Sequence, residues 1–285
     1  MRLRYAGYST QHIWKLVRYR YDFAILDAPE QYYYLRKFNE TLRIKDKASR
    51  INRFIHLDMS HIKEELRKSN IHTVSIHDAA YPRLLKEISD PPLILFYRGN
   101  KALLNHINAL AIIGARQATD YTKRILTEFA PTFKQHHFVI VSGLAKGADH
   151  MAHEMALTHH IPTIGVLGFG HLTHYPATTQ YARQRIERCG VVISEYLPTD
   201  KPRTYRFPER NRIISGLSQA ILVTEFKLRS GAQITVDLAL EQNRDVYVIP
   251  GRIFDEMSQG NLACMKQGAK VITSAEDIIE DFVKN

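Results

Sequence analysis

The sequence has 285 residues, of which 45% are apolar and 24% charged, as is usual for a soluble globular protein. No apolar run reaches the roughly 18 residues that a membrane-spanning helix needs, and the N-terminus lacks the features of a secretion signal. Two cysteines, Cys189 and Cys264, are too few for a disulfide framework or a cysteine-based metal site, so we expect a cytoplasmic protein.

The charge balance is basic and uneven. Lysine and arginine number 39 against 29 aspartates and glutamates, a formal net charge of +10. Residues 1–75 hold 15 basic and 8 acidic residues, whereas residues 76–285 hold 24 and 21. A basic excess favours a polyanionic partner, most often nucleic acid, because each neutralised phosphate releases counterions. The alternative is a solvated basic surface.

The first third of the chain predicts two kinds of structure. Residues 1–70 are almost free of glycine and proline, and their apolar side chains recur at helical spacing, so we expect a small all-α N-terminal domain. Residues 71–100 contain two strand-like runs, IHTVSI and LILFYRGN, around a short amphipathic helix. This stretch is expected to connect the helical domain to the domain that follows, residues 71–285.

From residue 109 the sequence repeats an apolar strand, a glycine-bearing turn and a helix. Examples are ALAIIG before TDYTKRILTEFAPTFKQH and FVIVSG before KGADHMAHEMALTHH. Wholly apolar strands that alternate with helices predict an α/β fold with a Rossmann-like, doubly wound, mostly parallel sheet. Such sheets bind ligands at the carboxyl ends of their strands, where the strand order reverses, so function should lie in these turns.

The first of these turns is suited to an anion. Gly114 and Arg116 lie between a strand and a helix for which Thr119 or Asp120 is the expected cap. Free N–H groups at the helix start and a guanidinium together can hold a phosphate. The alternative is a glycine needed for chain reversal and a surface arginine.

The second turn, SGLAKGAD, fits a phosphate-cradling loop through Ser142, Gly143, Lys146 and Gly147. It does not match a Walker A loop, and no turn in the chain carries the three-glycine dinucleotide fingerprint. We therefore expect neither a nucleotide cofactor nor ATP hydrolysis.

A cluster of metal-ligand types follows on the next helix, at Asp149, His150, His153 and Glu154. The spacing differs from the H-E-x-x-H arrangement of zinc hydrolases, so we expect no metal site. Asp149 is expected to favour the positive helix start, and His153 to pack or hydrogen-bond against the sheet.

The segment TDKPRTYRFPERNR, residues 199–212, is predicted to be a basic loop. Its lysine and arginines are interleaved with Tyr205 and Phe207. Cations can follow a phosphate backbone while aromatic rings stack on bases, as in grooves that bind single strands. The alternatives are a charged surface loop and, for Arg210 and Arg212, buried pairing with Glu195 or Glu225.

The motifs together resemble the DprA (Smf) family, the DNA-processing proteins of bacterial natural transformation. The matching text runs from about Tyr81 to Gly268 and includes IIGARQAT, SGLAKGADHMAHEMAL, FPERNRIISGLS, RSGAQITVDLALEQN and GNLACMKQGA. The resemblance implies an extended Rossmann fold that binds single-stranded DNA, protects incoming DNA, forms a homodimer and helps load the RecA recombinase. It implies no catalysis and no cofactor.

Carried over position by position, the resemblance implies thirteen DNA-binding residues: Gly114, Arg116, Ser142, Gly143, Lys146, Gly147, Phe207, Arg210, Asn211, Arg212, Arg229, Ser230 and Gly231. The family's serine in the first turn is Ala115 here, and a basic residue common after Tyr175-Pro176 is Ala177. The first departure removes one hydroxyl donor but keeps the backbone and Arg116, and the second removes the basic side chain expected to contact one phosphate.

The two ends of the chain match the family less fully. The N-terminal module of many members resembles a sterile-alpha-motif domain, and others end it in a helix-hairpin-helix whose Gly-rich turn is not visible here. Many members also end in a winged-helix-like extension, which we expect to be absent. The C-terminal third is expected to supply the homodimer interface, through Leu238, Leu240, Ile278, Ile279 and Phe282.

An enzymatic alternative is a nucleotide-processing enzyme on the same type of sheet, such as a phosphoribohydrolase. Its P-G-G-x-G-T-x-x-E motif supplies a catalytic glutamate. The comparable turn here, residues 229–235, lacks the two leading glycines and the glutamate.

Overall fold

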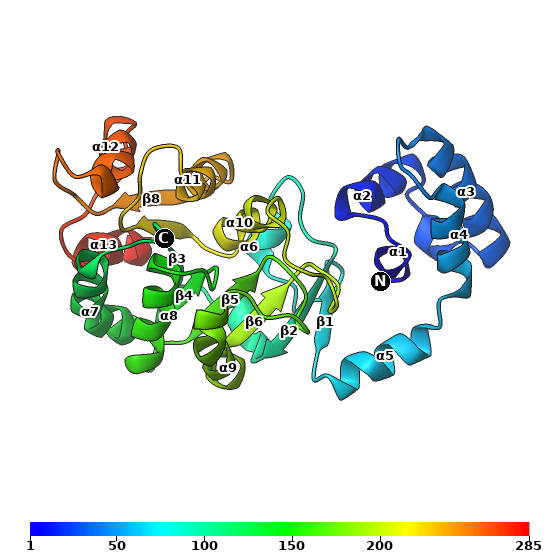
Figure 1. Cartoon of the computed structure of the whole chain (residues 1–285), viewed down its shortest axis with the longest axis horizontal. Helices are drawn as coiled ribbons and strands as arrows, with labels where there is room; N and C mark the ends of the chain where they lie inside the picture. Colours follow the sequence, from blue (N-terminus) through cyan, green and yellow to red (C-terminus); the bar gives the residue numbers. More distant parts are fainter. Residues whose placement is uncertain (285) are drawn as a thin grey trace. The chain divides into compact units, whose positions relative to one another are not determined.

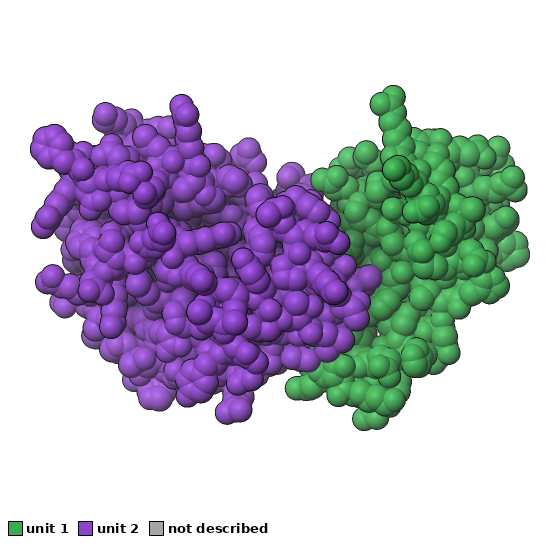
Figure 2. Space-filling view, viewed as in Figure 1, with its two compact units in different colours: residues 1–71, 92–94 green, residues 72–91, 95–285 purple. Residues whose placement is uncertain are grey.

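The structure is a computed structural model that describes residues 1–284. It divides into two compact units (Figure 2): residues 1–71 with 92–94, and residues 72–91 with 95–285.

The first unit is helical, as the spacing of its apolar residues predicts. Its helices are α1 (Arg2–Tyr5), α2 (Thr10–Tyr19), α3 (Ala28–Thr41), α4 (Lys47–His56) and α5 (Met59–Lys68), with a 3₁₀ turn η1 (Phe23–Ile25). Three of these helices have a side-chain cap at their N-terminus. The Ser9 side chain accepts a hydrogen bond from a backbone N–H group of α2, the Asp27 side chain accepts one from α3, and the Asp58 side chain accepts two from α5. Aromatic and leucine side chains from α2, α3 and α4 form the core.

The second unit contains a sheet that, within residues 1–284, has nine strands in the order β1-β2-β6-β5-β4-β3-β7-β8-β9 (Figure 1). The strands are β1 (His72–Ser75), β2 (Ile94–Gly99), β3 (Ala109–Ile113), β4 (Val139–Ser142), β5 (Thr163–Leu167), β6 (Val191–Ser194), β7 (Ala220–Val223), β8 (Asp245–Val248) and β9 (Lys270–Val271). From β6 to β9 all neighbours are parallel, and β2 pairs antiparallel with β6. The mostly parallel, doubly wound α/β fold is confirmed.

The helices of this unit are α6 (Arg83–Lys86), α7 (Asp120–Gln135), α8 (Ala148–Thr158), α9 (Gln180–Cys189), α10 (Arg206–Gly216), α11 (Gly231–Glu241), α12 (Gln259–Lys266) and α13 (Glu276–Lys284), with 3₁₀ turns η2 (Lys101–Asn105), η3 (Ala177–Thr179) and η4 (Glu256–Ser258). From β3 to β6 the chain winds one way through α7, α8 and α9, and from β7 it winds the other way through α11. Because such crossovers are right-handed, these two sets of helices cover opposite faces, which is why the strands are buried and apolar.

Strand order reverses at β3, which has β4 on one side and β7 on the other. The turns after these three strands therefore meet at one edge of the sheet. One boundary prediction was wrong here: α10 begins at Arg206, inside the stretch predicted to be a loop. Pro208 is tolerated because it lies in the first turn, where a backbone N–H has no helical partner.

No helix among residues 1–284 is long and apolar enough to span a bilayer. Cys189 is exposed, Cys264 is buried, and both are unpaired.

Candidate nucleic-acid interface

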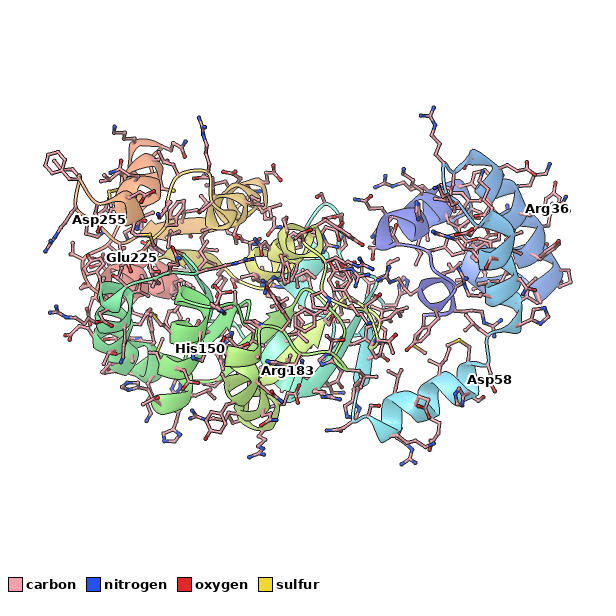
Figure 3. The ribbon with its side chains drawn as sticks, in the orientation of Figure 1. Arg36, Asp58, His150, Arg183, Glu225 and Asp255 are labelled. Carbon is pink, nitrogen blue, oxygen red and sulfur yellow. The ribbon has the colours of Figure 1, made fainter. Side chains whose placement is uncertain are left out.

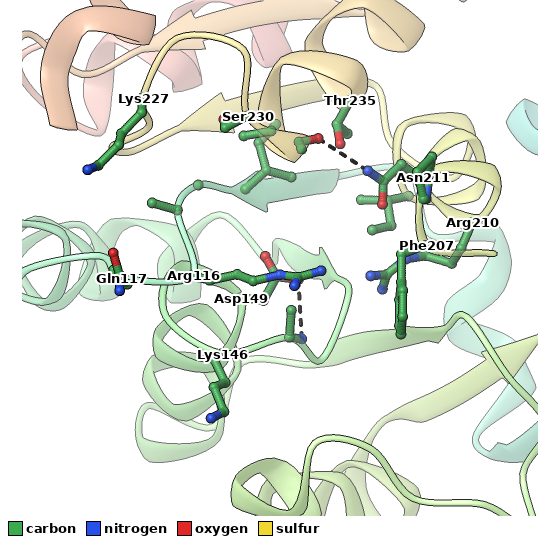
Figure 4. A pocket seen from close by; sticks show the side chains of 18 of the residues that line it. Arg116, Gln117, Lys146, Asp149, Phe207, Arg210, Asn211, Lys227, Ser230 and Thr235 are labelled. Atoms are coloured by element: carbon green, nitrogen blue, oxygen red, sulfur yellow. Dashed lines mark hydrogen bonds between the residues drawn. The ribbon is translucent and has the colours of Figure 1, made fainter. Parts of the chain in front are cut away.

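A pocket of about 600 Å³ lies where the turns after β3, β4 and β7 meet (Figure 4). Its walls come from the first turn, the second turn, the start of α10 and the start of α11. The lining residues with polar or aromatic side chains include Arg116, Lys146, Asp149, Phe207, Asn211 and Lys227. The pocket thus occupies the place at which doubly wound sheets bind ligands.

The first turn is fixed by the loop after β7. Ala115 donates its N–H to the Glu225 carbonyl (2.6 Å), and a Cβ at Gly114 would overlap Thr224 and Ala148. The Glu225 carboxylate, labelled in Figure 3, accepts the hydroxyls of Thr119 (2.8 Å) and Thr122 (2.5 Å). Thr119 also caps α7, as predicted. Of the two carboxylates considered as partners for a buried arginine, Glu225 instead accepts from Thr119 and Thr122.

The second turn is held from inside. The Ser142 hydroxyl is fully buried and donates to the Ile112 carbonyl (2.7 Å), while the Gly143 N–H donates to Asp149 (3.1 Å). Neither Ser142 nor Gly143 is among the residues that line the pocket. In this structure Ser142 and Gly143 shape the turn, and their contact with DNA stays a prediction.

Arg210 is the buried support of the second turn. Its guanidinium donates to the carbonyl oxygens of Gly143 and Val166 (both 2.5 Å), and only 4% of the residue is exposed. Burial raises the pKa of nearby Asp149, while the Arg210 charge and the N–H groups of Gly143 and Ala145 oppose this rise. Arg210 thus lines the pocket wall, and its Nη1 group holds the two carbonyl oxygens, whereas its buried Nε has no hydrogen-bond partner within residues 1–284.

Arg212 lies outside the pocket. Its guanidinium pairs with Glu195 (2.7 Å) and Asp90 (3.0 Å), and the side chain is 10% exposed. This is the buried pairing with Glu195 that the sequence offered as an alternative. In this structure Arg212 is a structural residue, because two carboxylates neutralise its charge, and a contact with DNA stays an untested prediction.

Two cations remain available at the pocket. Arg116 and Lys146 are exposed, and neither makes a hydrogen bond or ion pair with any residue in the described range 1–284. The Arg116 guanidinium lies 5.8 Å from the Phe207 ring centroid, and Tyr175 lies 5.8 Å from the same ring. The structure thus brings together two free charges and an aromatic wall.

The start of α11 forms the opposite wall. Asn211 reaches across to the Gly231 carbonyl (3.4 Å), and a Cβ at Gly231 would meet open space. The Ser230 hydroxyl is buried and has no hydrogen-bond partner within residues 1–284. Arg229 is exposed, with φ of 57°, and does not line the pocket. Of the RSG segment, Ser230 and Gly231 face the pocket.

Sequence reasoning missed Lys227. It lines the pocket and pairs with Glu256 (2.7 Å) in the turn before α12. The signal was its position in the turn after β7, two residues before Arg229.

The metal-ligand types on α8 do not converge. His153 is buried against Thr163 of β5 (2.8 Å), as predicted, and Glu154 pairs with Arg185 (3.2 Å). Among residues 1–284 no group of three histidine, cysteine or acidic side chains is placed to hold a metal ion.

Comparison with known proteins covers both units. The family model of DNA recombination-mediator protein A matches residues 72–283. DprA of Bacillus subtilis is 40% identical over 216 residues, 76% of this chain and 73% of that protein. DprA of Streptococcus pneumoniae is 35% identical over 281 residues, 99% of this chain and 96% of that protein.

Two solved structures agree. The X-ray structure of Streptococcus pneumoniae DprA superposes with a TM-score of 0.86 at 34% identity, over 99% of this chain and 96% of that one. A structure of Helicobacter pylori DprA, described for its single-stranded DNA binding mode, gives 0.68 at 28% identity, over 75% and 96%. The chain therefore belongs to the DNA recombination-mediator protein A (DprA/Smf) family.

Proposed function

We propose that this protein binds single-stranded DNA in the pocket between the turns after β3, β4 and β7. The observation that carries the proposal is the pair of unpartnered cations, Arg116 and Lys146, beside the Phe207 ring. Two cations can hold neighbouring phosphates while the ring accepts a base. A duplex keeps its bases stacked, so only a single strand can use both features.

Binding is proposed to occur without turnover. The one carboxylate among the described lining residues is Asp149, which accepts the N–H groups of Gly143 and Ala145. A nucleotide hydrolase needs a carboxylate that can hold a water or the sugar, and this one already serves the turn. Incubation with nucleoside monophosphates should release no free base. Release of a base would favour the phosphoribohydrolase alternative.

The decisive measurement is fluorescence anisotropy with an oligothymidylate and with a duplex of equal length over a salt series. We expect tighter binding to the single strand and a steep fall of affinity with salt, because phosphate contacts supply most of the binding. Equal affinity for both forms at moderate salt would contradict the proposal.

We further propose that the protein, acting in the reducing cytoplasm, protects incoming single strands and helps load RecA onto them. This extends the family membership and the single-strand pocket. The test is RecA strand exchange with and without the protein. Stimulation that disappears with Arg116→Ala is expected, and stimulation that survives this change would separate loading from the pocket.

A homodimer through the C-terminal part is proposed with a revised surface. Ile278 and Ile279 are buried in the core, so these two residues are unavailable to a partner, and Phe282 is partly buried against Phe138, with ring centroids 4.8 Å apart. Leu240 on α11 is 53% exposed and remains a candidate. Leu240→Glu should shift sedimentation at micromolar concentration from dimer to monomer. Only monomer in the unchanged protein would refute the dimer.

A further inference from the structure

Acidic and basic side chains of the N-terminal unit are unevenly distributed among its helices. The helices α1, α2 and α4 contain no aspartate or glutamate. Their lysines and arginines are Arg2, Arg4, Lys15, Arg18, Lys47, Arg50 and Arg53. The helices α3 and α5, by contrast, carry acidic and basic residues interleaved.

Residues of α2 and α4 lie on one face. Arg50 and Arg53 of α4 both reach the turn between α1 and α2, donating to the carbonyls of Gly7 (2.6 Å) and Ala6 (3.2 Å). Arg50 also lies over the ring of Tyr8, just before α2, at 5.7 Å from the ring centroid. Burial lowers the pKa of His12 on α2, and the charges of Arg50 and Lys15 lower it further. Arg18 follows Lys15 by one helical turn. We name Lys15, Arg18, Arg50 and Arg53 the basic face.

Carboxylates of this unit do not neutralise the basic face. Within residues 1–284, the ion pairs of this unit join Asp22, Glu64 and Glu65 to other cations. Lys15, Arg18 and Arg53 are exposed. The backbone bonds of Arg50 and Arg53 hold their guanidinium groups in place without removing the charge. Uncompensated cations held on one surface suit a polyanion, whose counterions they release.

We propose that the basic face is a second DNA site, separate from the pocket, which grips the phosphate backbone of another stretch of DNA. The choice of DNA rests on the proposed function of the pocket. Contacts from lysine and arginine to phosphate carry no sequence information, so the face should bind single strands and duplex alike. A second site would let one chain hold a strand in the pocket and a neighbouring segment on the helical unit.

The test compares two double variants with equal loss of charge in the full chain. Lys15→Gln/Arg18→Gln changes the basic face, at side chains with no hydrogen bond or ion pair within residues 1–284. The control, Arg36→Gln/Lys37→Gln, changes α3, a helix that also carries the acidic residues Glu30 and Glu40. Figure 3 shows Arg36 on this helix. The pocket contributes little to duplex binding, so the affinity for duplex should fall roughly fivefold to tenfold in the first variant. The slope of log affinity against log salt concentration should become shallower by about two. The control should stay within about twofold.

Equal effects of the two variants would show a dependence on net charge alone and would overturn the proposal, as would no effect of either. Unchanged DNA binding with lost binding to phosphatidylglycerol vesicles would make the face a lipid surface and also overturn it. Arg116→Ala keeps the two proposals distinguishable. If that change leaves single-strand binding intact, the pocket fails, whereas the basic face is judged by the Lys15/Arg18 variant on duplex.

Discussion

Gly147 and Ala115 touch across the two turns that form the pocket. The backbone of Gly147 has φ of +74°, and a Cβ there would overlap the Ala115 carbonyl oxygen. The same oxygen accepts the N–H of Ala148, at the first position of α8, at 3.0 Å. This contact sets the spacing between Arg116, which follows Ala115, and Lys146, which precedes Gly147. The distance between the two free cations therefore depends on residue 147 being a glycine, without a Cβ atom.

Gly147→Ala should destabilise the protein and weaken single-strand binding together. Positive φ costs an alanine about 1 kcal/mol, and moving the two turns apart adds roughly 1 to 3 kcal/mol. Gly268→Ala is the control, since its φ is +92° but nothing lies within 4 Å of its Cβ position. Urea unfolding and anisotropy check both variants. A Gly147→Ala protein no weaker in either measurement than the Gly268→Ala protein would contradict close packing as the cause.

Arg116→Ala should lower single-strand affinity on the order of tenfold and reduce the salt slope by about one, because it removes one charged phosphate contact. The Arg116 side chain is exposed and makes no hydrogen bond within residues 1–284, so thermal stability should not change. The measurement is anisotropy at several salt concentrations beside a thermal melt. Normal stability with unchanged affinity and slope would remove the first turn from the site.

The sequence predicted the fold well because its signals are local. Apolar strands such as 109–113 and 139–142, each followed by a glycine turn, determine strand and helix directly. The two-residue strand β9 and the short helix α12 were missed, since so short a strand shows no periodicity. The start of α10 was misplaced because a proline was taken as a sign of loop.

The site was predicted at the level of segments more than of side chains. The turns that carry Arg116, Lys146 and Ser230 do meet at the pocket. Whether an arginine faces solvent or the core depends on tertiary partners that lie far away in the sequence, as Val166 does for Arg210. Composition cannot reveal such partners, so the sequence left open whether Arg210 and Arg212 contact DNA or are buried in ion pairs.

Arg212→Ala should cost about 3 kcal/mol of unfolding free energy without a specific loss of DNA affinity. The change leaves Glu195, which is 5% exposed, and Asp90 without their counter-charge. Arg188→Ala, on the exposed side of α9, is the matched control and should stay within about 0.5 kcal/mol. Urea unfolding and anisotropy at a temperature where both variants are folded provide the readout. A stable Arg212→Ala protein with weakened binding would return Arg212 to the DNA interface.

Stability should fall with acidification through two buried histidines. Burial lowers the pKa of His153 and of His171 to about 3, from an ordinary value of 6.5. Between pH 3 and pH 6.5 the unfolded chain binds protons that the folded chain does not. The contribution of the two histidines to the free energy of unfolding is therefore complete above pH 6.5 and is lost as the pH falls toward 3.

Each of these histidines should contribute a slope of about 1.4 kcal/mol per pH unit below pH 6. Urea unfolding at pH 7.5, 6 and 5 measures the slope. His171→Gln should reduce the pH slope of the unfolding free energy by the contribution of one proton, whereas His77→Gln, at an exposed position, should leave the slope unchanged. The same slope in the His171→Gln protein as in the unchanged one would mean that His171 is protonated inside the fold, and that its hydrogen bond to the Phe96 carbonyl (3.0 Å) persists with the charged ring.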